Sequence, residues 1–364
     1  MSFSKQWIPR SIGCLRGYSV KKLSQDLVAG LTVGLVALPL AMAFAIASGV
    51  PPQAGIYTAV VAGFLISALG GSRTQIGGPT GAFVVIVAGI VVKFGLGGLA
   101  LVGIMAGVLL LVMGLTGLGA AVKYIPRPVT IGFTNGIALL IASTQIKDFL
   151  GEKTPSVPSE FLARLRMLLH YLGATRWQTV AVASGSLAII LLWPRLTKRV
   201  PGSIAALLLS TAVVAFFHLP IETIGSMFGG IPQGFPHFAL PVFQLESIVP
   251  LLPSAFTVAL LAAVESLLSA VVADGMSDDR HNSNMELVAQ GVANIVSPLF
   301  GGIPATGAIA RTATNIRSGA LTATGRNHSC THAPCHPPRR RPPCTLRTTG
   351  NPRRRSFCSC LQYG

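Results

Sequence analysis

The chain has 364 residues, of which 51% are hydrophobic and only 11% charged, whereas a soluble domain typically carries about a quarter charged residues. This composition excludes an ordinary soluble globular protein and indicates an integral membrane protein. The formal net charge of +17 is unevenly placed, because eight arginines and no acid follow Thr324. The basic residues before that point are ordinary for the connections of a protein with many spans, so we expect no nucleic-acid partner.

Long runs without a charged residue predict transmembrane helices embedded in a lipid bilayer. No charge occurs in residues 27–72, 74–92 or 94–122, and one span needs only about 20 apolar residues. Continuous apolar runs without strict alternation favour helices over a β-barrel. We expect full spans at residues 26–47, 54–69, 96–118, 129–146, 177–193, 203–217, 249–273 and 285–299.

The basic residues also predict the orientation of the chain in the membrane. Residues 1–25 contain five Lys or Arg and no acid, so the positive-inside rule places this N-terminal segment in the cytoplasm. Residues 218–248 are rich in Gly and Pro and are expected to form an extracytoplasmic linker. We therefore expect a multi-pass protein of the cell (inner) membrane.

Two Gly-Pro segments interrupt the pattern of full spans. Gly77-Gly78-Pro79-Thr80-Gly81-Ala82 and Gly302-Ile303-Pro304-Ala305-Thr306-Gly307-Ala308 each place Gly and Pro ahead of Thr-Gly-Ala. We expect one half-length helix to begin near Thr80 and another near Thr306. The offset of 226 residues between these threonines predicts that the two halves are copies of one design. Interrupted segments at matching positions indicate the binding site of a secondary transporter.

Helix N-termini bind anions, because their N–H groups are unpaired and the helix dipole places about half a positive charge there. Two such ends facing each other predict a pocket for a small inorganic anion. The candidate contacts are Thr80, Gly81, Ala82, Thr306, Gly307 and Ala308. The two threonine hydroxyls could donate to the ligand. For one motif alone, close helix packing by small residues is the better interpretation; the repetition reverses that preference.

Glu265 is the candidate for cation coupling, since it lies in an otherwise uncharged run, residues 247–273. An acid at the centre of a span costs roughly 2.5–3.5 kcal/mol on insertion scales, so we expect it to face a cavity. Ser269 lies one turn later on the same face. Together they could bind Na⁺, or Glu265 alone could take up H⁺. The structural alternative is a permanently protonated Glu that is hydrogen-bonded within the bundle.

Arg311 and Phe44 complete the candidate site. Arg311 could strengthen the positive potential around the anion, or else anchor a helix near the cytoplasm. Phe44 could form a wall of the site, although an aromatic residue in a span usually packs. We expect no cofactor apart from Na⁺ or H⁺ as the coupling ion, no bound metal and no enzymatic activity.

The composition changes abruptly in residues 320–364, which we predict to be a disordered basic tail. Cys330, His332, Cys335 and His336 resemble zinc ligands, but the spacing of a regular finger is missing. No later segment could cross a membrane, so the tail resembles translation in a shifted frame or another truncation. A membrane-anchored basic tail without transport activity is one alternative, which the lack of interleaved aromatic residues disfavours.

With these residues in view, the chain resembles the sulfate permease (SulP) family of anion transporters, bacterial type. The resemblance covers about residues 23–319. It rests on Leu38-Pro39-Leu40-Ala41-Met42-Ala43-Phe44-Ala45, Gly49-Val50-Pro51-Pro52, the first Gly-Pro segment, Val264-Glu265-Ser266-Leu267-Leu268-Ser269 and Arg280-His281-Asn282-Ser283-Asn284.

The resemblance implies an all-α polytopic fold of seven plus seven inverted spans, of which about ten are present. Core-domain helices would occupy residues 26–122 and 249–319. Gate-domain helices, which support a homodimer in the full-length protein, would occupy residues 123–217. Four more spans and a cytoplasmic STAS domain normally follow, so we expect a truncated chain that is inactive as this polypeptide.

The resemblance also implies where the ligands bind. The anion would lie between the starts of the third and tenth helices, at the two Thr-Gly-Ala sequences and beside Phe44. Glu265 and Ser269 would bind the coupling ion, and Glu at this position is compatible with H⁺ coupling. The expected function is therefore symport of sulfate or bicarbonate with H⁺ or Na⁺. A nucleobase transporter of the same architecture is the alternative, but it would be expected to bring an acid where this chain has Arg311.

Overall fold

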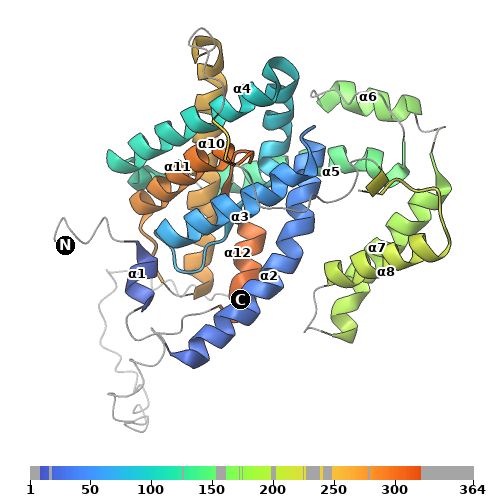
Figure 1. Cartoon of the computed structure of the whole chain (residues 1–364), viewed down its shortest axis with the longest axis horizontal. Coiled ribbons are helices and arrows are strands. Elements are labelled where there is room, and N and C mark those ends of the chain that lie inside the picture. The colour runs from blue at the N-terminus through green and yellow to red at the C-terminus, as the bar shows by residue number, and fades with distance from the viewer. Residues whose placement is uncertain are drawn as a thin grey trace, which may run out of the picture. The chain divides into compact units, whose positions relative to one another are not determined.

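In the computed structural model, the described residues are almost entirely helical (Figure 1). The predicted all-α fold is confirmed. The tail and most of the extracytoplasmic linker predicted above lie outside the described residues. Those described are 9–15, 19–124, 127–152, 161–171, 173, 175–197, 202–223, 225–226, 238–240, 248–277 and 279–320.

The first half begins with helices that have recognisable start signals. The N-cap Ser19 of α2 accepts a hydrogen bond from the Lys22 N–H, and Pro52 opens α3 at a position where its missing N–H costs nothing. The elements in this half are α1 (Arg10–Leu15), α2 (Val20–Ala47), α3 (Pro52–Leu69), β1 (Gly77–Gly78), α4 (Gly81–Leu115) and η2 (Leu118–Tyr124).

Helix α4 is two helices joined at Gly95. This glycine has φ 68° and ψ −174°, a conformation that interrupts helical hydrogen bonding and that residues with a side chain rarely adopt. A half-length helix therefore ends before Gly95, and a second helix begins with Leu96. The predicted half-helix near Thr80, followed by a span from residue 96, is confirmed.

The segment predicted as the gate domain is helical as well, with α7 and α8 packed side by side. None of the side chains of α7 is buried. The assignment of these helices to a separate gate stays a prediction. They are α5 (Arg127–Leu150), α6 (Phe161–Tyr171), α7 (Trp177–Leu196) and α8 (Gly202–Phe216).

The second half repeats the pattern of a long helix, a second helix and a broken segment. Its elements are α10 (Ile248–Ser277), α11 (Ser283–Leu299), β2 (Thr306–Gly307) and α12 (Ile309–Arg317). The half-helix expected near Thr306 begins three residues later, because Thr306 and Gly307 are extended and paired with the first half. The N-cap of α12 is Ala308.

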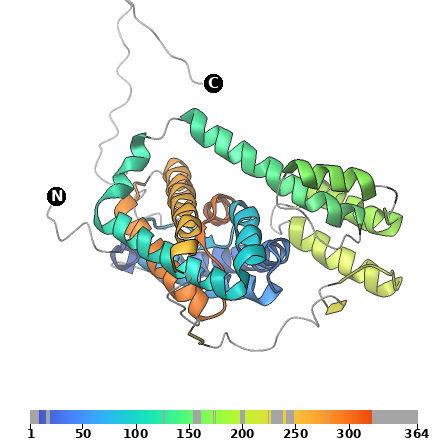
Figure 2. The same ribbon diagram turned by 90° about the horizontal axis from the view of Figure 1, so that it is seen from above.

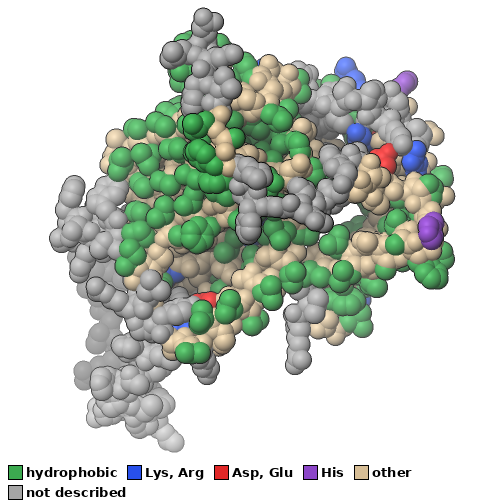
Figure 3. Space-filling model, in the orientation of Figure 1, with side chains coloured by type: hydrophobic (Ala, Val, Ile, Leu, Met, Phe, Trp, Pro, Cys, Tyr) green, Lys and Arg blue, Asp and Glu red, His purple; other side chains and the backbone are tan. Residues whose placement is uncertain are grey.

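Five of the described helices are long and apolar enough to cross a membrane, judged by length and composition. They are α2, α3, α4, α7 and α10; α8 is a shorter apolar helix, and α11 has 17 residues. Large apolar side chains are exposed on them, among them Leu31, Phe64, Val92, Trp177 and Leu191. Hydrophobic side chains cover much of the face seen in Figure 3. The chain is a multi-pass membrane protein.

The core lies where α4, α10 and α11 pack together (Figure 2). The α4–α11 contact depends on two glycines that face each other. A Cβ atom added to Gly107 would lie 2.7 Å from the Gly291 carbonyl oxygen, and one added to Gly291 would lie 2.8 Å from that of Gly107. Small residues that let backbones approach closely are a general means of packing membrane helices.

Candidate functional site

The two Gly-Pro segments, residues 77–82 and 302–308, lie side by side at the centre of the site. They are called the first break and the second break below. β1 and β2 pair in antiparallel fashion, with Gly77 opposite Gly307 and Gly78 opposite Thr306. The Ala308 N–H extends this pairing by donating to the Ile76 carbonyl oxygen at 2.8 Å. Antiparallel pairing sends α4 and α12 away from the ladder in opposite directions, so both helix N-termini remain beside it. The structure thus brings the two breaks together as the sequence predicted.

Gly78 and Gly307, within the β1–β2 pairing, could not be replaced by a larger residue without a change in the structure. Gly78 has φ 149°, which favours glycine. A Cβ atom on Gly307 would collide with the Gln75 side-chain amide and would lie 3.2 Å from the Ser266 Cα atom. Close packing, the alternative interpretation of a single motif, therefore applies here together with the approach of two helix N-termini.

Thr80 and Glu265 are direct partners. The Thr80 hydroxyl donates to Glu265 Oε2 at 2.9 Å, and both side chains are buried. Sequence reasoning assigned Thr80 to the anion and Glu265 to the cation, and did not predict their contact. The hydrogen bond places the candidate cation-binding carboxylate at the N-cap of the first half-helix.

Arg311 is buried against the first break, rather than exposed at the end of a span. Its Nη2 atom donates to the Pro79 carbonyl oxygen at 3.1 Å, and Nη1 lies against Gly78. Among the described residues, Nε and Nη1 of Arg311 have no hydrogen-bond partner. The charges of Arg311 and Glu265 attract each other. A buried guanidinium with unused donors is a strong binding group for an oxyanion.

Thr306 and Ser269 have partners of their own. The fully buried Thr306 hydroxyl donates to the Ala262 carbonyl oxygen at 3.0 Å. Ser269 Oγ lies 3.2 Å from Thr312 Oγ1, whose oxygen accepts the Ile76 N–H. The hydroxyls of Thr80 and Thr306 thus both donate hydrogen bonds to α10. Ser269 links α10 to α12, on the side of the second half-helix.

The remaining predicted residues lie around the start of α4 and α12. A Cβ atom on Gly81 would lie 3.2 Å from Phe44 Cε1 and would collide with Ile141 of α5. Phe44 therefore lies beside the first turn of α4, where it could form one wall of the candidate site. Ala82 belongs to the first turn of α4, and Ala308 is buried at the N-cap of α12.

Sequence reasoning missed a group of buried polar residues around these segments. Gln75 precedes β1, Ser266 follows Glu265, and three residues of α11 complete the group: Glu286, Gln290 and Asn294. The four-residue spacing along α11 was the available signal, since such residues share one helix face.

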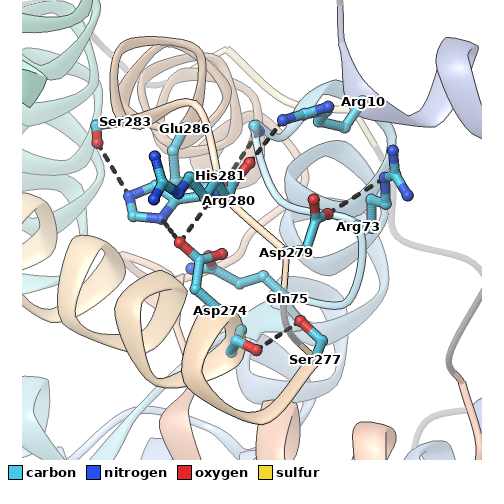
Figure 4. Close-up of polar contacts among 12 residues, drawn as sticks. Arg10, Arg73, Gln75, Asp274, Ser277, Asp279, Arg280, His281, Ser283 and Glu286 are labelled. Carbon is cyan, nitrogen blue, oxygen red and sulfur yellow. Dashed lines mark hydrogen bonds and ion pairs between the residues drawn. The ribbon is translucent and has the colours of Figure 1, made fainter. Parts of the chain in front are cut away.

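A second polar cluster lies at the end of the helices near α1 (Figure 4). His281 Nδ1 lies 2.7 Å from Asp274 Oδ2, and Arg73 pairs with Asp279 at 3.3 Å. Arg10 of α1 donates to the Arg280 carbonyl oxygen at 2.6 Å. These contacts join the connection after α3 to the connection between α10 and α11.

Comparison with known proteins identifies relatives along most of the chain. Residues 23–325 match the sulfate permease family. A putative sulfate transporter, YvdB of Bacillus subtilis (strain 168), is 50% identical over 86% of this chain and 59% of its own length. The bicarbonate transporter BicA of Picosynechococcus sp. is 36% identical over 83% of this chain and 55% of its own length. The chain thus spans less than two thirds of the length of these relatives.

Solved structures show the same fold. The transmembrane domain of a cyanobacterial BicA superposes with a TM-score of 0.74 and 35% identity, over 84% of this chain and 79% of that one. The murine anion transporter Slc26a9 gives a TM-score of 0.75 with 19% identity, over 87% of this chain and 57% of that one. The inverted-repeat transporter fold is therefore confirmed, and no enzyme is among these relatives.

Proposed function

The chain belongs to the sulfate permease family, and from this premise we propose that it carries a small inorganic anion across a membrane by secondary active transport. Sulfate is the first candidate, because the 50% identical relative is named a putative sulfate transporter. Bicarbonate is the second, since two relatives at 36% identity are named bicarbonate transporters.

One observation carries the anion site: Arg311 is buried beside both helix N-termini, and two of its donor atoms have no partner in the part of the chain that the structure describes. A guanidinium presents N–H groups in a planar fork that fits two oxygens of one anion. The N-termini of α4 and α12 add partial positive charge from the helix dipoles. Phe44 supplies an apolar wall beside Gly81. This combination suits an oxyanion better than a nucleobase, which has no net negative charge for Arg311 to balance.

We further propose that Glu265 couples the anion to H⁺ or Na⁺. While ionised, its carboxylate accepts a hydrogen bond from the Thr80 hydroxyl and attracts Arg311. A proton or Na⁺ on Glu265 removes or balances this negative charge, and leaves the Arg311 charge and the Thr80 hydroxyl available to the anion. Cation and anion therefore favour each other's binding, as symport requires. Ser269 would contribute a hydroxyl oxygen to Na⁺.

The proposed setting is the inner membrane, with the basic N-terminal segment in the cytoplasm and a homodimer in the full-length protein. The five basic residues of segment 1–25 support this orientation. Single cysteines placed at Arg10 and at Leu240, in a chain whose native cysteines are replaced, test it in whole cells: an impermeant thiol reagent should label the exposed position 240 in the predicted linker and leave position 10 unlabelled.

The function is tested by binding and by uptake. Purified protein in lipid nanodiscs is expected to bind labelled sulfate, and unlabelled sulfate or bicarbonate should compete. Uptake by a full-length version in proteoliposomes should require an inward gradient of H⁺ or Na⁺. The proposal is wrong if neither anion competes and neither gradient drives uptake.

A further inference from the structure

Helix α11 carries one continuous buried polar face. Glu286, Gln290 and Asn294 are spaced four residues apart and each is 0% exposed. Polar side chains inside a membrane helix are unfavourable unless they find partners. Here the partners belong to the two broken segments and to the helix that carries Glu265, as the contacts below show.

Glu286 holds the chain that leads into the first break. Its Oε2 atom accepts the Gly71 N–H at 2.9 Å, while Oε1 accepts from Ser266 and from Gln290, both at 3.3 Å. A Cβ atom on Gly71 would collide with the Asn282 carbonyl oxygen and would lie 3.1 Å from the Glu286 nitrogen. Only glycine lets this connection reach the start of α11.

Ser266 joins the first break to both helices of the second half. Its hydroxyl oxygen accepts from Gln75 Nε2 at 3.0 Å and from Gln290 Nε2 at 2.9 Å. Gln75 Nε2 also donates to the Ser266 carbonyl oxygen at 3.1 Å. Because Ser266 directly follows Glu265, the same contacts fix the turn of α10 that presents the carboxylate to Thr80.

Asn294 holds the second break in the way that a neighbouring strand would. Its Oδ1 atom accepts the Ala305 N–H and its Nδ2 atom donates to the Ala305 carbonyl oxygen, both at 2.8 Å. One side chain thus satisfies both backbone groups of a buried residue next to β2. Nδ2 also donates to the Gln290 carbonyl oxygen at 2.9 Å, which fixes the orientation of the amide.

We infer that the polar face of α11, formed by Glu286, Gln290 and Asn294, is the positioning element of the anion site. It fixes Gly71 ahead of the first break and Ala305 within the second, and thereby sets where the two helix N-termini lie. These are positioning residues, because they act on the anion only through the segments they hold. The effect on anion binding rests on the proposed function; the effect on the two backbones does not.

The test combines hydrogen exchange with sulfate binding, on the purified 364-residue chain in nanodiscs. Asn294→Leu removes both bonds to Ala305 with little change of shape, and Glu286→Leu removes the acceptor of the Gly71 N–H. Glu286→Gln is the conservative rescue, since its remaining oxygen still accepts from Gly71. Leu287→Ala is the matched control: it empties a fully buried apolar site on the same helix and removes no side-chain hydrogen bond, since leucine has no polar atoms.

We expect a crossed pattern. Asn294→Leu should speed exchange mainly in residues 302–308 and Glu286→Leu mainly in residues 71–78, while either should weaken sulfate binding about tenfold or more, because a buried backbone group loses its partner. Glu286→Gln should stay near the wild type. Leu287→Ala should lower the melting temperature but leave the two segments and the sulfate affinity unchanged.

The inference is overturned if both Leu variants exchange like the wild type in these segments, or if Leu287→Ala reproduces their effects. If the Leu variants do not fold, Asn294→Asp decides, because it keeps only one of the two bonds to Ala305 and should speed exchange in residues 302–308 to a smaller extent; no change there overturns the inference. A wild-type chain that binds neither anion refutes the proposed function, and hydrogen exchange alone then decides on the positioning role.

Discussion

Two side chains of opposite charge, Arg311 and Glu265, contact consecutive residues at the start of α4. Arg311 donates to the carbonyl oxygen of Pro79, and Glu265 accepts from the hydroxyl of Thr80. Both charged side chains come from the second half of the chain, whereas Pro79 and Thr80 belong to the first. A change of charge at Glu265 therefore alters the electrostatic potential where the anion is proposed to bind. Substitutions of Glu265 and of Arg311 test the two roles separately.

Glu265→Gln is expected to remove the influence of the coupling cation while leaving sulfate binding in place. The amide oxygen can still accept the Thr80 hydrogen bond, but the side chain neither takes up a proton nor balances Na⁺. Coupling between sites is typically 1–3 kcal/mol, so the wild type should show about 5–150-fold tighter sulfate binding with the cation present. The measurement is sulfate affinity with and without Na⁺, at acidic and neutral pH.

Thr257→Val is a suitable control, since this exposed hydroxyl on the same helix donates to the Pro253 carbonyl oxygen, one turn earlier in α10. Its cation dependence should equal that of the wild type. If sulfate binding by Glu265→Gln depends on the cation as strongly as in the wild type, Glu265 does not couple the two ions.

Arg311→Gln is expected to weaken sulfate binding by about tenfold or more, because charge-assisted hydrogen bonds to an anion are roughly twice as strong as neutral ones. Arg311→Lys should be intermediate, since it keeps the charge and loses the planar fork. Equilibrium binding of labelled sulfate measures both. The matched control is Arg317→Gln, an exposed arginine on the same helix; equal losses at the two positions would contradict a specific role for Arg311.

At the scale of single elements, close contact between α4 and α11 sets the frame for both breaks. Gly107→Ala would press a methyl group into the backbone of α11, 2.7 Å from the Gly291 carbonyl oxygen and 2.8 Å from the Ile295 nitrogen. Backbone atoms cannot turn away as a side chain could. We expect a loss of about 1–3 kcal/mol in the free energy of unfolding, measured by denaturant titration in mixed micelles.

Gly89→Ala, in the first of the two helices that make up α4, supplies the comparison, because nothing lies within 4 Å of the added Cβ atom. Replacing a helical glycine by alanine in open space stabilises by roughly 0.5–1 kcal/mol. If the two substitutions change stability by the same amount, the close α4–α11 crossing is not a source of stability.

The elements could be predicted from the sequence where local chemistry decides them. Gly and Pro ahead of Thr80 and Thr306 indicated the two breaks, and uncharged runs indicated the long helices. The start of α12 was predicted three residues early, because pairing with β1 keeps Thr306 and Gly307 extended. No local sequence pattern predicts paired residues that lie 228 and 230 positions away.

The candidate site was predictable as a set of residues but not as a set of contacts. A lone acid in an apolar run made Glu265 a candidate, and its hydrogen bond to Thr80 depends on how α10 crosses the start of α4. The role of the polar face of α11 was not predicted, because its partners are backbone groups of Gly71 and Ala305. Side-chain patterns reveal which face of a helix is polar, and they say nothing about which backbone it will satisfy.

At the scale of the whole molecule, neither half of the chain completes the site. Phe44 and Thr80 come from the first half, and Glu265 and Arg311 from the second. The two halves join through the β1–β2 ladder and through the contacts of α11. A direct test of this arrangement asks whether the two breaks touch in the membrane, independently of any transport assay.

Cysteines placed at Ile76 and Ala308, with the native cysteines replaced, are expected to form a disulfide. These positions adjoin the paired residues of the antiparallel ladder, where Cα atoms lie about 4.5–5.5 Å apart, within the range that a disulfide spans. Oxidation in membranes followed by a gel shift after proteolysis between the sites measures the bond. Each single cysteine is the control, and failure of the double variant to cross-link under oxidation would place the breaks apart.

The pairing of Gly77–Gly78 with Thr306–Gly307 also has a consequence for biosynthesis. The ribosome begins to make the second of these segments 229 residues after it began the first. At the usual elongation rate of about 5–20 residues per second, the wait is on the order of 10–50 s. Peptide groups without partners are strongly disfavoured among lipid tails. The nascent first half must therefore keep this segment hydrated, or sheltered by the insertion machinery, until its counterpart arrives.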